Sequence, residues 1–355
     1  MKRRWQRRWP AVVRHLTCTL TCTLTWALTC TLTCALAGTL TSTGACAGGL
    51  AATSSGAYAA DICPPPLPST AAKGPARDRG LLWRVTRDGR SSWLFGTLHV
   101  GKPAWARLGP RVTAALQASD VLAVEIDPGD PALAHVLTEP GPPLALPAKL
   151  QARLERAYQR ACVAPAALAA LHPVLQATLL AVLDARWLGL DAAYAQENVL
   201  LARAQGGVDG KALQPSRPAL RVVALETAAQ QKSALLPTDP AEVLPALDTS
   251  LTQLEDPSGR RVLARLVRAW ERGDLHTLST YEQWCACATT MEERAFMRRL
   301  NDERNPGLAD GIEAQHRAGQ RVFAAVGALH MTGPAALPWL LARRGFRVER
   351  IVFGR

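Results

Sequence analysis

The chain has 355 residues, a formal net charge of +12 and 48% hydrophobic residues, enough for the core of one large domain or two ordinary ones. Half of that charge lies in residues 1–60, which contain basic residues but no acidic ones, and the other half is spread along the chain. Nucleic-acid binding requires a concentrated basic patch, so we expect no nucleic-acid partner.

Residues 1–60 have the organisation of a signal peptide. A basic segment from Lys2 to Arg14 precedes an apolar, Thr-rich stretch, and Ala57-Tyr58-Ala59 fits an Ala-x-Ala cleavage site. The leader predicts a periplasmic or secreted protein whose mature chain begins near Ala60. A retained leader that anchors the chain to a membrane is the alternative. No later apolar run is long enough to span a bilayer, so no stable membrane span is expected after cleavage.

The remaining chain divides into an irregular arm at 61–80 and a single domain at 81–355. Two apolar runs at 82–86 and 92–95 flank Asp88-Gly89, which predicts a β-hairpin. A helix is expected over 104–119, where apolar residues recur on one face. The nearly continuous apolar run at 121–126 is typical of a strand buried on both faces.

The second half of the domain alternates between helical and strand patterns. Residues 145–205 are rich in Ala and Leu and predict helices broken at Pro165 and Pro173. Further buried strands are expected at 221–226 and 321–327, and a last strand at 346–352, with helices up to about residue 318 and over 334–344. This alternation predicts an α/β fold with a mixed central β-sheet, flanking helices and a large helical insertion.

Four cysteines remain outside the leader, and an even number in an exported chain indicates disulfides. Cys285 and Cys287 are separated by one residue, and a bond between them would be strained. We therefore expect two structural bridges in which each of these two cysteines reaches a distant partner, Cys63 or Cys162. Free buried thiols are the alternative.

Polar residues follow three of the predicted strands. The hairpin runs into Gly96 and His99, the next strand carries Glu125, and a late strand runs into Gly327 and His330. Ligand sites of open α/β sheets collect at strand ends, so these side chains are expected to form one site. Glu226 repeats the pattern at the end of another apolar run.

Two imidazoles and a carboxylate can support more than one chemistry. They can bind a divalent metal ion with an open coordination position, or act as a general base and the group that orients it. Glu226 could instead cap the following helix or face solvent. The other histidines lie in segments predicted as helix or loop, and no site role is expected for them: His135, His172, His276 and His316.

The ordered set of motifs resembles the TraB/GumN family, which is related to the TIKI metalloproteases. The first motif is Leu94-Phe95-Gly96-Thr97-Leu98-His99-Val100, and the strand Ser119–Asp127 follows it. The later motifs are Gly189-Leu190-Asp191, Ala224–Gln231, Trp270–Asp274, Glu303-Arg304-Asn305 and Val326–Gly333. The likeness extends from about residue 82 to residue 352.

The resemblance implies a TIKI/erythromycin-esterase-like fold and a metal-dependent hydrolase, peptidase-like, acting on a peptide or a small ester or amide. It implies that His99, Glu125 and His330 bind a divalent transition metal (Mn, Co or Zn), with Glu226 and Arg304 in the same catalytic site. Glu226 or Asp127 would take the proton of water, and Arg304 would stabilise the oxyanion. On this hypothesis, His99→Ala or His330→Ala abolishes hydrolysis without unfolding the protein.

Two alternatives to this enzyme remain open. In a metal-free esterase, His99 would act as general base with Glu125 orienting it. A non-catalytic regulatory protein would instead hold a peptide, haem or metal in the same pocket. The sequence does not decide between them, and it leaves the oligomeric state open.

Overall fold

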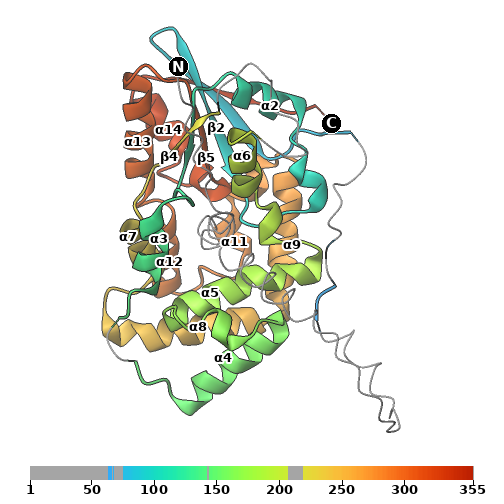
Figure 1. Ribbon diagram of the computed structural model, residues 1–355, viewed down its shortest axis with the longest axis vertical. Coiled ribbons are helices and arrows are strands. Elements are labelled where there is room, and N and C mark those ends of the chain that lie inside the picture. The colour runs from blue at the N-terminus through green and yellow to red at the C-terminus, as the bar shows by residue number, and fades with distance from the viewer. Residues whose placement is uncertain (1–62, 66, 68–74, 142–143, 207–218, 355) are drawn as a thin grey trace, which may run out of the picture.

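The computed structural model describes residues 63–65, 67, 75–141, 144–206 and 219–354. The predicted signal peptide at 1–60 lies outside the described residues. In Figure 1 the β-sheet occupies the upper half of the molecule, and helices α4, α5 and α8 lie together below it. None of the described helices is long and apolar enough to cross a membrane.

Six strands form one mixed sheet in the order β4-β3-β5-β2-β1-β6. β2, β3, β4 and β5 run parallel, whereas β1 pairs antiparallel with both β2 and β6. The predicted mixed sheet is therefore confirmed. The strands are β1 (Leu81–Arg87), β2 (Arg90–Thr97), β3 (Val121–Val124), β4 (Arg221–Ala224), β5 (Val322–Gly327) and β6 (Arg347–Ile351).

The predicted hairpin is confirmed as β1 and β2. Asp88 and Gly89 have φ of 52° and 69°. Positive φ at both central residues of a two-residue loop matches the right-handed twist of the flanking strands, and Asp-Gly tolerates it. The hairpin places the end of β2 beside β5, so that His99 and His330 follow neighbouring parallel strands.

Helices cover both faces of the sheet and build a separate lower layer. The predicted breaks are confirmed, because Pro165 begins a 3-10 turn and Pro173 begins α5. The α-helices are α2 (Pro110–Gln117), α3 (Pro131–Thr138), α4 (Ala148–Ala161), α5 (Pro173–Asp184), α6 (Gln196–Ala204), α7 (Ala228–Leu235), α8 (Val243–Glu255), α9 (Pro257–Glu271), α10 (Leu275–Ser279), α11 (Tyr281–Trp284), α12 (Met291–Leu300), α13 (Asn305–Arg317) and α14 (Leu337–Arg343). The 3-10 helices are η2 (Pro103–Ala106), η3 (Pro165–Ala167), η4 (Ala185–Leu188), η5 (Ala192–Tyr194), η6 (Pro240–Glu242) and η7 (Ala328–Met331).

Two predicted elements differ from the structure. The helix expected over 104–119 begins only at Pro110, because proline favours the first helical position and the Asp78 carboxylate accepts the N–H groups of Arg111 and Val112. The strand expected to be buried at 221–226 is β4, which lies at the edge of the sheet with both of its ends exposed. Its apolar run therefore did not indicate burial on both faces.

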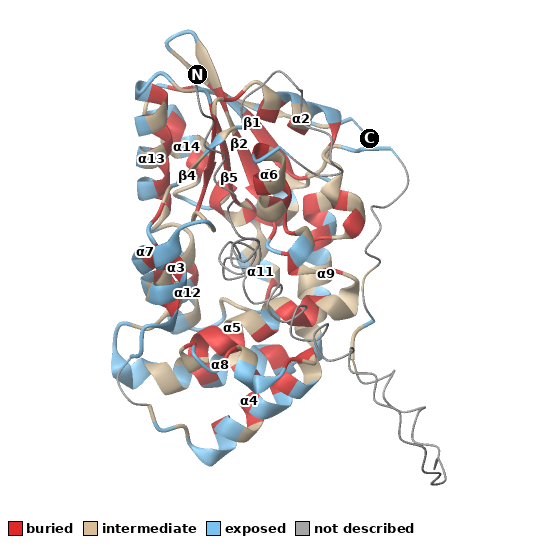
Figure 2. Cartoon of the chain, viewed as in Figure 1, coloured by how far each residue is buried: buried red, intermediate tan, exposed pale blue. Residues whose placement is uncertain are grey.

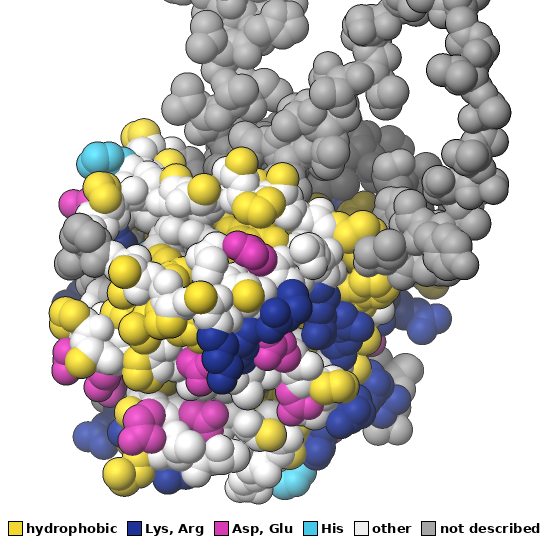
Figure 3. All heavy atoms as spheres, turned by 90° about the horizontal axis from the view of Figure 1, so that it is seen from below, with side chains coloured by type: hydrophobic (Ala, Val, Ile, Leu, Met, Phe, Trp, Pro, Cys, Tyr) yellow, Lys and Arg dark blue, Asp and Glu magenta, His cyan; other side chains and the backbone are white. Residues whose placement is uncertain are grey.

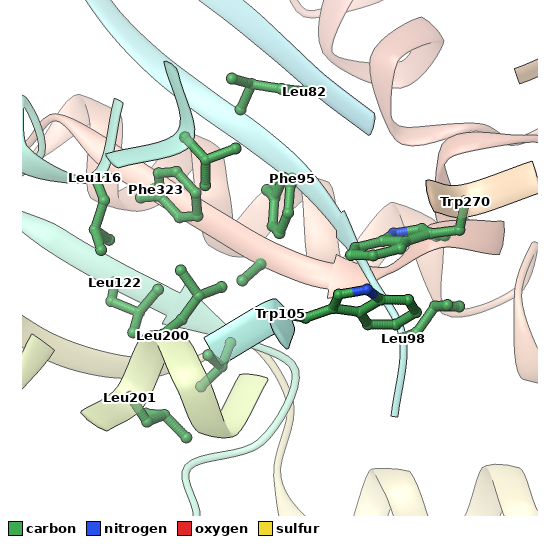
Figure 4. Close-up of a cluster of buried hydrophobic side chains, with 14 of the residues drawn as sticks. Leu82, Phe95, Leu98, Trp105, Leu116, Leu122, Leu200, Leu201, Trp270 and Phe323 are labelled. Carbon is green, nitrogen blue, oxygen red and sulfur yellow. The ribbon is translucent and has the colours of Figure 1, made fainter. Parts of the chain in front are cut away.

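The alternation of side chains along the strands divides the core into two layers. Phe95 and Phe323 point to the face covered by α2 and α6, where Trp270 packs against Phe95 and Trp105 packs against Trp270 (Figure 4). Neighbouring strand residues point to the opposite face and pack on α13 and α14. Figure 2 shows the strands largely buried and the outer helix faces exposed. Burial of β2, β3 and β5 on both faces makes the centre of the sheet a rigid base for the ends of these strands.

The disulfide pairing differs from the expectation. Two bridges are present among the described residues, but Cys63 bonds to Cys162, and Cys285 bonds to Cys287 with 5.1 Å between their Cα atoms. The prediction of a distant partner for Cys285 and Cys287 was therefore wrong. The intervening Ala286 adopts φ of 55°, and this left-handed conformation turns the chain enough for the two sulfur atoms to meet.

Basic side chains form a band across the face of the molecule seen in Figure 3, with acidic side chains beside it. The helices of the lower layer pair such charges. Arg153 of α4 is bound by Asp248 and Glu255 of α8, and Asp184 at the end of α5 accepts hydrogen bonds from both Arg160 and Arg260. These ion pairs hold helices together, which accounts for part of the basic charge without a nucleic-acid partner.

Asp184→Asn is expected to lower the free energy of unfolding by about 2 kcal/mol at neutral pH, since two guanidinium groups lose a charged acceptor. Burial opposes ionisation of Asp184, but hydrogen bonds from Arg260 and Arg160 outweigh it and lower its pKa. The wild type therefore loses this contribution to stability as the pH falls below about 3.9, and the free energies of unfolding of the wild type and Asp184→Asn converge there. Urea unfolding at several pH values measures the difference. The exposed pair of Asp310 with Arg344 provides the control, Asp310→Asn, which should cost below about 1 kcal/mol.

Candidate functional site

The carboxyl ends of the four parallel strands lie on the same side of the sheet, and the polar residues that follow these strands lie there. His99 follows β2, Glu125 follows β3, Glu226 follows β4, and His330 lies in η7 directly after β5. Leu225 and Glu226 continue the backbone pairing, with Glu226 N–H donating to the carbonyl of Glu125 at 2.9 Å. The parallel register brings these residues of distant sequence positions to the same edge, as their strand-end positions predicted.

Gly327 lies at the centre of the cluster. A Cβ atom at this position would lie 3.3 Å from Glu125 Oε1, 3.5 Å from His330 Cδ2 and 3.9 Å from His99 Nε2. These three side chains therefore surround one point, and a side chain at residue 327 would crowd it. The Gly327 N–H donates to Glu125 Oε1 at 2.7 Å, which fixes one oxygen of the carboxylate.

Arg304 links the buried carboxylates. Its Nη2 lies 2.5 Å from both Glu125 Oε2 and Glu226 Oε2, and its Nε donates to Glu226 at 2.9 Å. Its Nη1 donates to the Leu300 carbonyl at 2.9 Å and lies 3.4 Å from His330 Nε2. A guanidinium has five N–H donors, and these contacts engage all of them. All N–H donors of Arg304 are therefore used in these contacts, and none is left for an oxyanion in this arrangement.

Burial by itself would raise the pKa of Glu125, but the neighbouring His330, the Arg304 guanidinium and the Gly327 N–H favour the ionised form and lower that pKa well below its usual range. Glu125 is 6% exposed and Glu226 is 8% exposed. A carboxylate at such a depth requires a compensating charge. Arg304 provides this charge for both residues. Glu125, Arg304 and Glu226 therefore form a buried, ion-paired triad that supports the site.

His330 is 3% exposed, and Asn305, the first residue of α13, fixes its orientation. Asn305 Nδ2 donates to the carbonyls of Ala335 and His330, which leaves Oδ1 to accept a hydrogen bond from His330 Nδ1 at 2.6 Å. This network assigns the proton to Nδ1 and the lone pair to Nε2. Burial, with Arg304 alongside, lowers the pKa of His330 to about 4 despite the nearby Glu125. His330 is therefore neutral at physiological pH.

His99 has the opposite environment. Its side chain is 59% exposed, and its Nδ1 lies 3.1 Å from Glu197 Oε1. Glu197 lies in the first turn of α6, and Thr97 Oγ1 donates to the same carboxylate oxygen. The Glu197 carboxylate raises the pKa of His99 to about 9. The ring is consequently a stronger base than free histidine, and its Nε2 is the atom that faces Gly327.

Three residues of this site were missed from the sequence. Thr97 and Asn305 lie within the motifs but had no assigned role, and Glu197 lies in the predicted helical segment 145–205. Glu197 does not follow a strand, so a search of strand ends could not find it. The helix begins beside β2 because Gln196 N–H donates to the carbonyl of Leu98 at 3.1 Å. This contact places the carboxylate of Glu197 against His99.

Other predicted roles differ from the geometry. Glu197, and not Glu125, contacts His99 Nδ1. Asp127 accepts the Gly129 N–H at 2.8 Å within a turn, and the structure gives it no contact with the cluster. Thr227, and not Glu226, caps α7. The remaining histidines stay outside the site, as expected: His135 and His276 are exposed on helices, His172 caps α5, and His316 is buried in α13 against Phe346.

The residues present do not fit a metal ion in this arrangement. Among the described residues, no three His, Cys, Asp or Glu side chains are grouped so as to hold one. His330 Nε2 and Glu125 Oε1 are 3.7 Å apart, a spacing that two ligands of one ion can have, but Arg304 contacts both residues. A guanidinium at this point repels a second cation and competes for the same lone pairs.

Glu197→Gln is expected to return the pKa of His99 from about 9 towards the ordinary value of about 6.5, because the amide carries no negative charge. The pKa is measured by following the His99 ring resonances by NMR, and high salt should reduce the wild-type shift because the ring is exposed. Glu282→Gln on α11 is the control, since that side chain is exposed and distant in sequence. An unchanged pKa in Glu197→Gln would show that another group controls His99.

Comparison with known proteins agrees with the strand-end motifs. The model of the TraB/PrgY/gumN family matches residues 81–350. No curated protein and no solved structure matches the chain significantly. The family match spans the hairpin, the sheet and every residue of the cluster, and the chain therefore belongs to the TraB/PrgY/gumN family.

Proposed function

We propose that the chain is a hydrolase of carboxylic amides or esters, peptidase-like, in which His99 moves the proton. The observation that supports this most is the contrast between the two histidines. His99 has an exposed ring whose Nδ1 is held by Glu197, whereas His330 is buried. A histidine whose one ring nitrogen is held by a carboxylate, with the other nitrogen directed into the cluster, is the arrangement of a general base.

In the proposed reaction, the neutral form of His99, which is the minor form at neutral pH because Glu197 raises the pKa to about 9, accepts a proton from water at Nε2 while the water oxygen adds to the substrate carbonyl carbon. The bond from that carbon to nitrogen or oxygen then breaks, and His99 returns the proton to the leaving group. Glu197 stabilises the imidazolium that exists between these two steps. The triad of Glu125, Arg304 and Glu226 holds the strand ends and Gly327 in place beneath the reacting atoms.

The metal-dependent hydrolase predicted from the sequence is a second candidate, and the charge of the site favours it. Three carboxylates, Glu125, Glu197 and Glu226, face one guanidinium and two imidazoles, of which the buried one is neutral. Glu197 Oε2 is also a buried atom without a hydrogen-bond partner in the described residues. His99, Glu125 and His330 would hold Mn, Co or Zn only after Arg304 moved away from His330 and Glu125. Such an ion would activate water at neutral pH.

A screen of peptide and ester substrates, with and without chelator, tests the proposal and separates the two candidates. We expect hydrolysis that survives dialysis against EDTA and is lost in His99→Ala. Activity that disappears with chelator and returns with manganese, cobalt or zinc would favour the metal site. Tight binding of a peptide or haem without turnover would instead support the regulatory protein.

We also propose that the protein functions in the periplasm or outside the cell. Two disulfides in one chain support this, because thiols are kept reduced in most cytosols. The basic, apolar leader predicted at 1–60 is consistent with export. Sequencing the N-terminus of the protein recovered from an extracytoplasmic fraction tests it, with cleavage after Ala59 as the expected result.

A further inference from the structure

The Cys285–Cys287 disulfide lies in the turn between α11 and α12 and shares no residue with the proposed hydrolytic site. The other disulfide joins residues 99 positions apart, Cys63 in the N-terminal arm and Cys162 at the end of α4. The two bonds therefore differ in what they do for the fold. A bond that closes a long loop restricts the unfolded chain strongly, whereas one that closes a loop of three residues restricts it little.

The backbone at Cys285–Cys287 is held in an unfavourable conformation. Ala286 has φ of 55°, a left-handed conformation that L residues other than Gly, Asn and Asp rarely adopt. Opening the disulfide would let this residue leave that region, which favours the reduced form.

The two sulfur atoms are not equivalent. Cys285 is 5% exposed, whereas Cys287 is partly exposed and follows the exposed Ala286. The Cys287 N–H donates to Cys285 Sγ at 3.0 Å. An N–H directed at sulfur stabilises a thiolate, so Cys285 is suited to leave and Cys287 is suited to be attacked.

The surroundings leave Cys287 accessible to a larger molecule. Thr289 and Thr290, which follow the pair, are exposed, and Met291 at the start of α12 is 73% exposed. Met291 is the most exposed large apolar side chain of the described residues. An apolar contact next to a reactive disulfide suits an unfolded or extended peptide that carries cysteine.

We propose that Cys285–Cys287 is a thiol–disulfide exchange site whose substrates are thiols, with cysteine-containing peptides preferred. A substrate thiolate attacks Cys287 Sγ, the Cys285–Cys287 bond breaks, and Cys285 leaves as a thiolate that takes up a proton. A second thiolate of the same substrate then attacks the substrate sulfur of the mixed disulfide and releases Cys287. The substrate dithiol loses two electrons and becomes a disulfide, and the two cysteines of the chain gain them.

The first test compares the two disulfides of the same folded chain. The full chain is equilibrated with graded ratios of reduced to oxidised glutathione, quenched with acid, alkylated and mapped by mass spectrometry. We expect Cys285–Cys287 to be reduced more readily than Cys63–Cys162. The equilibrium constants for reduction of the two bonds by glutathione should differ at least tenfold, which corresponds to a difference in reduction potential of about 30 mV or more. Reduction of both bonds together, or of Cys63–Cys162 first, would overturn the proposal.

The second test identifies the attacked sulfur and the source of the thiol. Cys285→Ser leaves Cys287 free, and Cys287→Ser leaves the buried Cys285 free. With oxidised glutathione or a short Met-flanked peptide disulfide, Cys285→Ser should form the mixed disulfide at least tenfold faster than Cys287→Ser. Met291→Ser should slow the peptide reaction and leave the glutathione reaction unchanged. Equal rates for the two cysteine variants would contradict the assignment of Cys287, and an equal effect of Met291→Ser on both reagents would contradict the preference for peptides.

Discussion

Arg304→Met is expected to lower the free energy of unfolding by about 3–5 kcal/mol at neutral pH. The substitution keeps most of the side-chain volume but removes the guanidinium that contacts Glu125 and Glu226, which are 6% and 8% exposed. Two buried carboxylates would then face each other without a compensating charge. Urea unfolding followed by circular dichroism measures the change. Arg298→Met, on the exposed side of α12, should change stability by less than about 0.5 kcal/mol.

The pH dependence identifies the cause of this loss. In the wild type, Arg304 helps to lower the pKa of Glu125, so its contribution to stability is present at neutral pH and is lost as the pH falls. In Arg304→Met, burial instead raises that pKa, and stability improves as protonation removes the charge. The difference in free energy of unfolding between the wild type and Arg304→Met should therefore become smaller below about pH 4. A difference that stays constant with pH would show that lost packing, and not uncompensated charge, destabilises the variant.

A second substitution tests the charges directly. Adding Glu125→Gln and Glu226→Gln to Arg304→Met should recover part of the lost stability, since neutral amides need no counterion. Failure of the amides to recover any stability would count against the role given to Arg304.

His99→Ala is expected to reduce hydrolysis by about 10²- to 10⁴-fold while the protein remains folded, because this histidine is the proposed general base and its ring is 59% exposed. Steady-state kinetics on the substrate found in the screen, together with thermal melting, measure both effects. His276→Ala provides the control, as it removes an exposed histidine from α10, outside the cluster. Full activity in His99→Ala would remove His99 from the mechanism, whichever candidate function applies.

His330→Ala should behave differently from His99→Ala, although the sequence treats the two motifs alike. His330 is 3% exposed and bonded to Asn305, so its removal leaves a cavity and an unpaired buried amide oxygen. We expect a stability loss of about 2–4 kcal/mol, in contrast to the sequence-based expectation of lost hydrolysis without unfolding. Activity should therefore be measured well below the melting temperature of this variant.

The sequence alone determined the sheet strands, the hairpin turn and the strand-end positions of His99, Glu125, Glu226 and His330. Each of these depends on local information: an apolar run of strand length, an Asp-Gly pair that accepts positive φ, or a polar residue where an apolar run ends. The edge position of β4 was not predictable in this way. A short apolar run such as residues 222–225 looks the same at the edge of a sheet and in its centre, because periodicity does not encode which strands are neighbours.

Only the tertiary structure decided which partner each site residue has. Glu197 reaches His99 because α6 begins against the end of β2. Arg304 joins Glu125 to Glu226 because it stands at the start of α13, where its guanidinium reaches the carboxylates that follow β3 and β4. The same holds for Cys285 and Cys287, whose bond depends on the φ of the residue between them. The sequence specifies which side chains can ionise, bind or bond. Distances and burial decide which of them meet, and these follow from packing between segments that are far apart along the chain.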